Sequence, residues 1–255
     1  QTDIETGDIS RGWSQHRWRI SKILMPDSKI KNVQKYRLSD DELAWVEAWE
    51  WFVQNIPDDN LPGHPIWSDQ FKAEPEIPKD CPDWKKNFLI KNSQFYVTHK
   101  AIIDRWKKMK WGKSQKTVSE FPPSRQLFEW QAKRAHPCRE GRTLKDLVLQ
   151  FRPSGIRVKP PTYLPALVAI TQTSVVGPDV KAGIKEYREL TPQEAAELQC
   201  MPHDVFEASG IDDKAAYKQL GNAVNVGVVR YLANRLINPE AAVKGQLKLK
   251  LNFDR

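Results

Sequence analysis

Three segments of the 255-residue chain carry apolar residues at helical spacing. In residues 38–56, apolar positions recur every three or four residues, and Ser39 with Glu42 three positions later has the pattern of a capping box. In residues 190–199, Thr191 precedes a proline at the first helical position, and Glu194 completes a second box. Residues 225–237, "NVGVVRYLANRLI", place valines and leucines on one side. Each segment is predicted to be a helix.

Less regular patterns predict further elements. Apolar residues between Ile102 and Met109 favour a helix that begins near Thr98, and "FPPSRQLFEWQAKR" (121–134) predicts that a helix restarts after the Pro-Pro break, with Ser124 as its cap. Residues 15–26 and 164–177 read as strands, and the tail 245–255 alternates Leu with Lys as a short edge strand would. Six prolines between Pro57 and Pro82 predict an irregular excursion.

Charge is concentrated in one third of the chain. Residues 81–160 hold 19 Lys and Arg against 6 Asp and Glu, a balance of +13, whereas residues 1–80 sum to −5 and residues 161–255 to zero, which together give the net +8. A basic segment within an otherwise balanced chain favours a surface that binds phosphates. An ordinary solvated face is the alternative interpretation.

Other compositional signals exclude several classes of protein. No apolar run is long enough for a membrane span, and the first residues lack the basic start and apolar stretch of a signal peptide. The cysteines, Cys81, Cys138 and Cys200, lack the spacing of a disulfide frame or a zinc site, so no metal is expected. A cytoplasmic protein without a membrane partner is predicted.

Three segments, in this order, resemble the closing blocks of the DNA cytosine-5 methyltransferases. "QHRWR" matches a Gln-x-Arg-x-Arg element, "YRELTPQEAAELQCMP" is similar to the block that usually reads R-x-L-T-x-x-E-x-x-x-L-Q-G-F-P, and "YKQLGNAVNVGVV" resembles the final Y-x-Q-x-G-N-A/S-V block. The resemblance implies a mixed α/β fold: the end of a Rossmann-like methyltransferase domain joined to an irregular α+β target-recognition domain.

The family order divides the chain into four parts. Residues 1–28 would be a strand of the catalytic domain, residues 29–177 the target-recognition domain, residues 178–238 the capped helix and the closing helix that return to the catalytic domain, and residues 239–255 a tail. The recognition part contains the basic segment. Its side chains suited to phosphates and base edges, and therefore the predicted DNA contacts, are Arg152, Arg157, Lys159, Thr171 and Thr173.

The final block offers a site for an anion. Gly221 permits close backbone approach, Asn222 can form a hydrogen bond across a loop, and amides of Ala223 and Val224 at a helix start would favour negative charge. The family implies that this anion is the carboxylate of S-adenosylmethionine. A Gly-Asn turn that only caps a helix would explain the same residues.

In a strand, Gln15, Arg17 and Arg19 share one face. The resemblance implies that this face lines the pocket of the flipped cytosine in a supporting catalytic role, where a fixed cation steadies the ring as it gains charge. A surface strand whose arginines pair with carboxylates is the alternative. The Arg188, Thr191 and Glu194 block is interpreted as scaffold.

Other parts expected of the family do not occur in this sequence. Its nucleophile belongs to a Pro-Cys dipeptide that precedes the Gln-x-Arg-x-Arg element, whereas Cys138, although preceded by Pro137, lies far after it. Cys200 and Met201 also replace the usual Gly-Phe. The resemblance therefore predicts the C-terminal half of the enzyme, with the other half on a second polypeptide or a missing segment.

The functional expectation is a part of a DNA cytosine-5 methyltransferase. It would bind double-stranded DNA, belong to a bacterial or phage-encoded restriction-modification system near the nucleoid, and transfer a methyl group only with its other half. The alternatives are a non-catalytic, sequence-specific DNA-binding protein on a methyltransferase-like scaffold and a module whose basic face binds an acidic protein.

Overall fold

The computed structural model describes residues 18–57, 61–162, 164, 167, 173–202, 204–206 and 210–237. Six strands form one mixed sheet in the order β1-β2-β4-β3-β5-β6, in which β2 and β4 are parallel and the other neighbours antiparallel. The strands are β1 (Ile66–Trp67), β2 (Leu127–Trp130), β3 (Val148–Arg152), β4 (Gly155–Lys159), β5 (Val175–Val176) and β6 (Arg188–Glu189). The helices are α1 (Asp40–Asn55), α2 (Asp83–Thr98), α3 (Lys100–Lys108), α4 (Pro192–Leu198), α5 (Asp213–Asn222) and α6 (Val226–Ile237).

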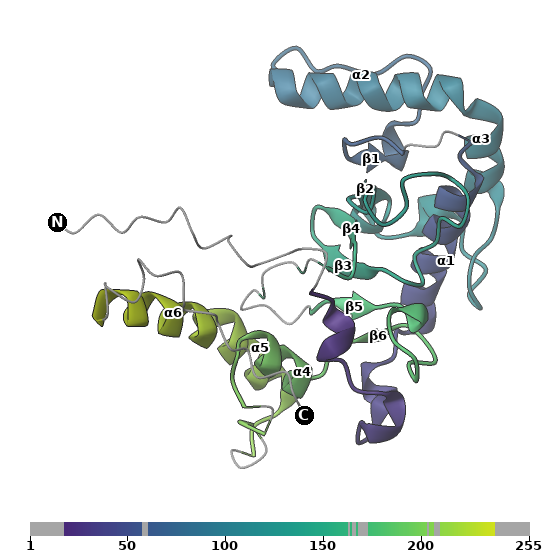
Figure 1. Cartoon of the computed structure of the whole chain (residues 1–255). Coiled ribbons are helices and arrows are strands. Elements are labelled where there is room, and N and C mark those ends of the chain that lie inside the picture. The colour runs from purple at the N-terminus through teal and green to yellow at the C-terminus, as the bar shows by residue number, and fades with distance from the viewer. Residues whose placement is uncertain are drawn as a thin grey trace.

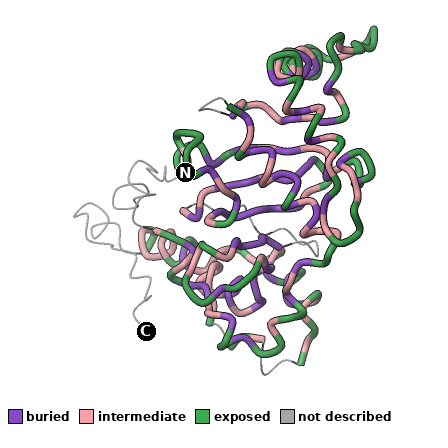
Figure 2. Tube along the Cα trace, turned by 90° about the vertical axis from the view of Figure 1, so that its right-hand side faces the viewer, coloured by how far each residue is buried: buried purple, intermediate pink, exposed green. Residues whose placement is uncertain are grey.

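One face of the sheet packs against α1 (Figure 1). Alternate strand residues point to this face, and the core there is aromatic: Trp49 of α1 stacks on Phe128 of β2 with ring centroids 4.5 Å apart. The indole nitrogens of Trp49 and Trp106 donate to backbone carbonyls, so neither buried ring leaves a polar atom unpaired. Figure 2 shows that buried positions concentrate along these strands.

The opposite face is apolar at one end and polar at the other. Val148 of β3 and Val176 of β5 pack there against Ile20, Ile23 and Leu24. Further along the sheet, β2 and β4 present charged and amide side chains instead. Gly155 starts β4 with φ +120°, and a Cβ at this position would lie 2.9 Å from the carbonyl oxygen of Leu127. Only glycine lets β4 approach β2 so closely.

The two capped helices predicted from sequence are confirmed. Ser39 and Glu42 form both hydrogen bonds of a capping box at the start of α1, and Thr191 and Glu194 do the same at α4. The helices predicted near Thr98 and over 225–237 correspond to α3 and α6. Residues 61–82 are irregular apart from the short β1 and a 3₁₀ turn, and the helix α2 that follows them is not predicted by the sequence pattern.

Two predicted elements are wrong. The expected helix over 121–134 is a 3₁₀ turn at Pro123–Arg125 followed by β2, because Phe128 pairs with Ile156 across the sheet. The expected strand over 15–26 contains a 3₁₀ turn at Ile20–Lys22, since Ile20 is anchored by donation from its amide to the carbonyl of Pro161. Of the strand over 164–177, only its end is described, as β5, and the tail 245–255 lies outside the described residues.

The sheet continues across one predicted boundary between parts of the chain. β5 ends at Val176 and pairs with β6, which lies beyond the boundary predicted after residue 177. α4, α5 and α6 gather beyond the β6 end of the sheet (Figure 1). The division into four parts stays a prediction.

Candidate functional site

On the polar face of the sheet, Arg152 of β3 and Arg157 of β4 share the carboxylate of Glu129 on β2. Glu129 Oε2 accepts from Arg152 Nη2 at 2.7 Å and from Arg157 Nε at 3.0 Å, and Gln131 donates to the other carboxylate oxygen. The arginine side chains remain 21% and 26% exposed. Burial and the neighbouring Arg157 lower the pKa of Arg152. Among the described residues, the terminal nitrogens of Arg157 have no acceptor, so they can donate to a ligand.

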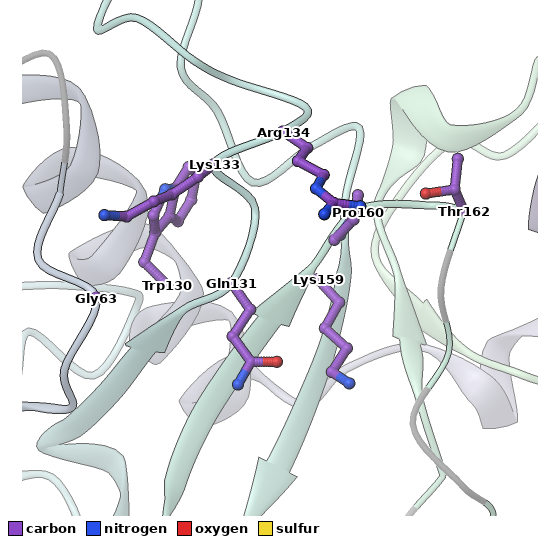
Figure 3. A pocket seen from close by; sticks show the side chains of 8 residues that line it. All are labelled: Gly63, Trp130, Gln131, Lys133, Arg134, Lys159, Pro160 and Thr162. Carbon is purple, nitrogen blue, oxygen red and sulfur yellow. The ribbon is translucent and has the colours of Figure 1, made fainter. Parts of the chain in front are cut away.

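A groove of about 410 Å³ lies where the parallel strands β2 and β4 end. Figure 3 shows Lys133 and Arg134 on the loop after β2 and Lys159 at the end of β4, with the guanidinium of Arg134 beside Pro160. Lys159 is only 6% exposed, and burial followed by the charge of Arg157 lowers the pKa of its ammonium group. Because Lys133 and Arg134 line the groove as well as Lys159, the groove is positively charged despite this shift.

A third cluster is fully buried and joins distant parts of the chain. The guanidinium of Arg188 is bidentate to Glu194 at 2.8 and 2.9 Å, its Nε donates to Asp27 at 3.3 Å, and the remaining donors bond the carbonyls of Met25 and Glu189. All five donors are thereby used. Burial lowers the pKa of Arg188, but Glu194 and Asp27 outweigh it, so the pKa is raised overall. These contacts support the interpretation of this block as scaffold.

Helix α4 ends in a Schellman motif beside the cluster. The amide of Met201 donates to Ala196 and that of Cys200 to Glu197, and Cys200 has a left-handed backbone with φ +56°. Glycine is the usual residue in this conformation, which explains why the related block reads Gly where this chain has Cys200. The replacement of glycine by Cys200 therefore leaves the backbone turn intact.

The three segments that resemble the methyltransferase blocks meet around α4. Ile20 and Trp18, at the end of the first segment, pack in a cluster with Leu190 and Leu198. From the third segment, Tyr217 donates to the carbonyl of Leu190, and the side-chain amide of Asn225 donates to Leu198. Segments about 200 positions apart in sequence thus contact the same short helix.

The predicted base-pocket residues are only partly described. Arg19 is exposed and precedes the first 3₁₀ turn in an extended conformation. Gln15 and Arg17 lie outside the described residues, as does Thr171 among the predicted DNA contacts. Thr173 is buried, and its contact with DNA stays a prediction. Arg152, Arg157 and Lys159 lie together on the polar sheet face.

The predicted arrangement of amides after Gly221 needs correction. The amide of Ala223 donates to the carbonyl of Leu220 and closes α5. At the start of α6, the amide of Val226 donates to Gln199 and that of Val228 to the side chain of Asn225. These bonds satisfy the helix start from within the chain. The donors that remain for a ligand include the exposed carboxamide of Asn222 and the amide of Val224, which has no acceptor among the described residues.

Sequence reasoning did not single out Glu129, Gln131, Lys133 or Arg134 for this site. Their roles depend on the parallel pairing of β2 with β4, which brings residues about 28 positions apart side by side. The alternation of Phe128, Glu129 and Trp130 in and out of the core was the available signal.

Among the described residues, no helix has both the length and the apolar character required to cross a bilayer. No solved structure matches the chain. The chain is 34% identical to the type II methyltransferase M.AluI of Cellulosimicrobium cellulans over an alignment of 283 residues, which covers 93% of this chain and 50% of that protein. It therefore spans about half the length of this relative. The profile of the C-5 cytosine-specific DNA methylases matches residues 10–238, and the chain belongs to that family.

Proposed function

We propose that this chain is the DNA-binding and target-recognition part of a DNA cytosine-5 methyltransferase of a restriction-modification system. It would act on cytosine in duplex DNA when joined to the half that carries the Pro-Cys nucleophile. The observation that carries the proposal is the meeting of the three family-like segments around α4. A chain that used these segments for an unrelated purpose would have no need to hold them together.

The surface of α6 supports the need for a partner. Val228, Val229, Leu236 and Ile237 are 49% to 75% exposed on this helix, and Val224 just before it is 68% exposed. Apolar residues so close together usually mark an interface. The alignment covers half of M.AluI, so the part of M.AluI outside the alignment is similar in length to this chain. We infer that α6 packs against the half that carries the nucleophile, whether it is a second polypeptide or a preceding segment.

The polar sheet face supports binding to duplex DNA. Arg152 and Arg157 are held by one carboxylate, so their guanidinium planes are ordered before any ligand arrives. Arginine recognises guanine edges in the major groove through paired donors, and such a pair discriminates by about 1–3 kcal/mol. This face is therefore the proposed reader of the target sequence.

S-adenosylmethionine fits the donors near α6 in part. The side chain of Asn222 and the amide of Val224 can hold one carboxylate, and the rest of the cofactor would contact the other half. When bound, the cofactor supplies the methyl group. Arg19, exposed beside the Ile20 cluster, is proposed to hold the negative charge that develops on the flipped base, together with Gln15 and Arg17.

The test combines the chain with a polypeptide carrying the Pro-Cys and Gly-rich blocks. We expect methyl transfer to cytosine, loss of turnover in Arg19→Gln, and nearly unchanged DNA affinity in that variant. Lys22→Gln is the matched control, because Lys22 is also exposed and basic and lies in the adjacent 3₁₀ turn. Transfer to adenine, or sequence-specific binding without any transfer, would contradict the proposal; the second result would favour a non-catalytic DNA-binding protein.

A further inference from the structure

The groove at the ends of β2 and β4 has the lining of an anion site. Among the described residues that line it, three are cationic and none is acidic. Lys133 and Arg134 come from the loop after β2, whereas Lys159 comes from the strand, so the charges are fixed to two separate elements (Figure 3). Gln131 and Thr162 add neutral hydrogen-bond donors.

Lys91 adds positive charge near Lys133, since the charges of both lysines act on His64. Lys133 Nζ lies 3.7 Å from the point where a side chain on Gly63 would begin, which places it beside the half-buried ring of His64. Burial, and after it the charges of Lys91 and Lys133, lower the pKa of His64. The imidazole is therefore neutral at physiological pH, and its buried Nε2 has no partner among the described residues.

The groove continues the polar sheet face. Arg157 and Lys159 are two residues apart on the same side of β4, about 7 Å along the strand. At the Arg157 end, Glu129 offsets part of the charge, but no carboxylate lies among the described residues of the groove. Arg157 and Lys159 thus join the polar sheet face to the groove, and the charge of Glu129 acts on both of them.

We propose that this groove binds a backbone phosphate of duplex DNA and anchors the duplex while the arginine pair contacts bases. The inference rests on the proposed function, and it assigns a separate task to Lys133, Arg134 and Lys159. A phosphate contact adds affinity for any sequence and makes binding depend on salt, because each neutralised phosphate releases counterions.

The test measures binding of the full chain to a target duplex and a scrambled duplex over a range of salt concentrations. In the double variant Lys133→Gln and Arg134→Gln, we expect the slope of log K against log salt to become shallower by about 1 to 2, since each lost phosphate contact removes about 0.9. Affinity should fall by the same factor for both duplexes. The control is Lys29→Gln with Lys31→Gln, which removes the same charge from exposed sites outside the groove.

The outcomes separate this inference from the proposed function. An unchanged slope in the groove variant, or an equal decrease in the control, would overturn the phosphate site while leaving DNA binding intact. Saturable binding of inorganic phosphate by the unaltered chain, lost in the groove variant without any change on DNA, would assign the groove to a free anion and also overturn it. Failure of the unaltered chain to bind any duplex would contradict the proposed function first.

Discussion

Two clusters in this molecule pair arginine with glutamate, and they differ in how far water reaches them. Around Arg188, every guanidinium donor has an acceptor and the side chain is 0% exposed. Around Glu129, two arginines share one carboxylate oxygen and stay about one fifth to one quarter exposed. The pairing of arginine with glutamate therefore occurs once with every guanidinium donor bonded and once with guanidinium donors that remain available to a ligand.

The difference in burial determines whether each arginine can act in structure or in ligand binding. A saturated buried guanidinium cannot bind anything else, so Arg188 contributes only to the structure. An arginine that is held by a carboxylate but retains open donors is ordered and still reactive toward a ligand. The exposed pair contributes little to stability and is suited to recognition, which is the reverse of the buried cluster.

Replacing Arg188 has the largest expected effect. Arg188→Met would leave the carboxylates of Glu194 and Asp27 buried without their cation, so we expect a loss of about 3–5 kcal/mol in the free energy of unfolding, measured with denaturant at pH 7. Glu76→Gln, which breaks the exposed Lys72–Glu76 pair, should leave the midpoint unchanged. A loss below 1 kcal/mol in Arg188→Met would remove the distinction between the two clusters.

Replacing Arg157 should leave the fold intact and reduce recognition. Arg157→Gln is expected to lower discrimination between target and scrambled duplexes by about 1–3 kcal/mol, because the proposed paired contact with a base would be lost. Thermal unfolding should shift little, since the side chain is partly exposed. Arg230→Gln, at an exposed site on α6, serves as the control in the same binding assay. Equal losses on both duplexes would show that Arg157 contacts phosphate instead.

Glu189 extends the comparison, because it follows Arg188 in sequence while the guanidinium of Arg188 pairs with Asp27 and Glu194. Burial and then the charge of Glu42 raise the pKa of Glu189 to about 7. In the unfolded chain its pKa returns to the ordinary value of about 4.5, so between pH 4.5 and 7 the folded state binds more protons. The carboxyl therefore destabilises the fold as pH rises through this window, by at most about 1.4 kcal/mol per pH unit.

The measurement compares unfolding free energies of the wild type and Glu189→Gln at pH 5 and pH 7.5. We expect the variant to gain stability relative to the wild type as pH increases, because its side chain cannot ionise. A difference that stays constant with pH would mean that Glu189 is solvated like an ordinary surface carboxyl.

The sequence was most informative where signals are local. Both capping boxes place their partners three residues apart, so Ser39 with Glu42 and Thr191 with Glu194 could be recognised directly. Helix α2 was missed because its residues are mostly polar and exposed, and it lacks a side-chain cap. Its few buried residues are held by distant partners: Asn92 bonds the amide of Trp67.

The features that could not be predicted depend on contacts between residues distant in sequence. Leu127 to Trp130 were expected to be helical, yet they form β2 by pairing with β4. The bond between Arg188 and Asp27 spans 161 positions, and no local pattern contains it. Of the candidate site, the basic face could be predicted from charge, but the sharing of Glu129 by Arg152 and Arg157 could not, because it depends on the register of three strands.

The buried cluster also brings together the two ends of a long excursion of the chain. Met25 and Asp27 bond directly to Arg188 and Glu194, so the polypeptide leaves and returns at nearly one point. Because the ends of the intervening stretch are fixed close together, a change in the length of its surface loops need not move the residues on either side. The loops of the proposed DNA-reading portion can therefore change, and with them its proposed sequence preference, while the residues on either side stay in place.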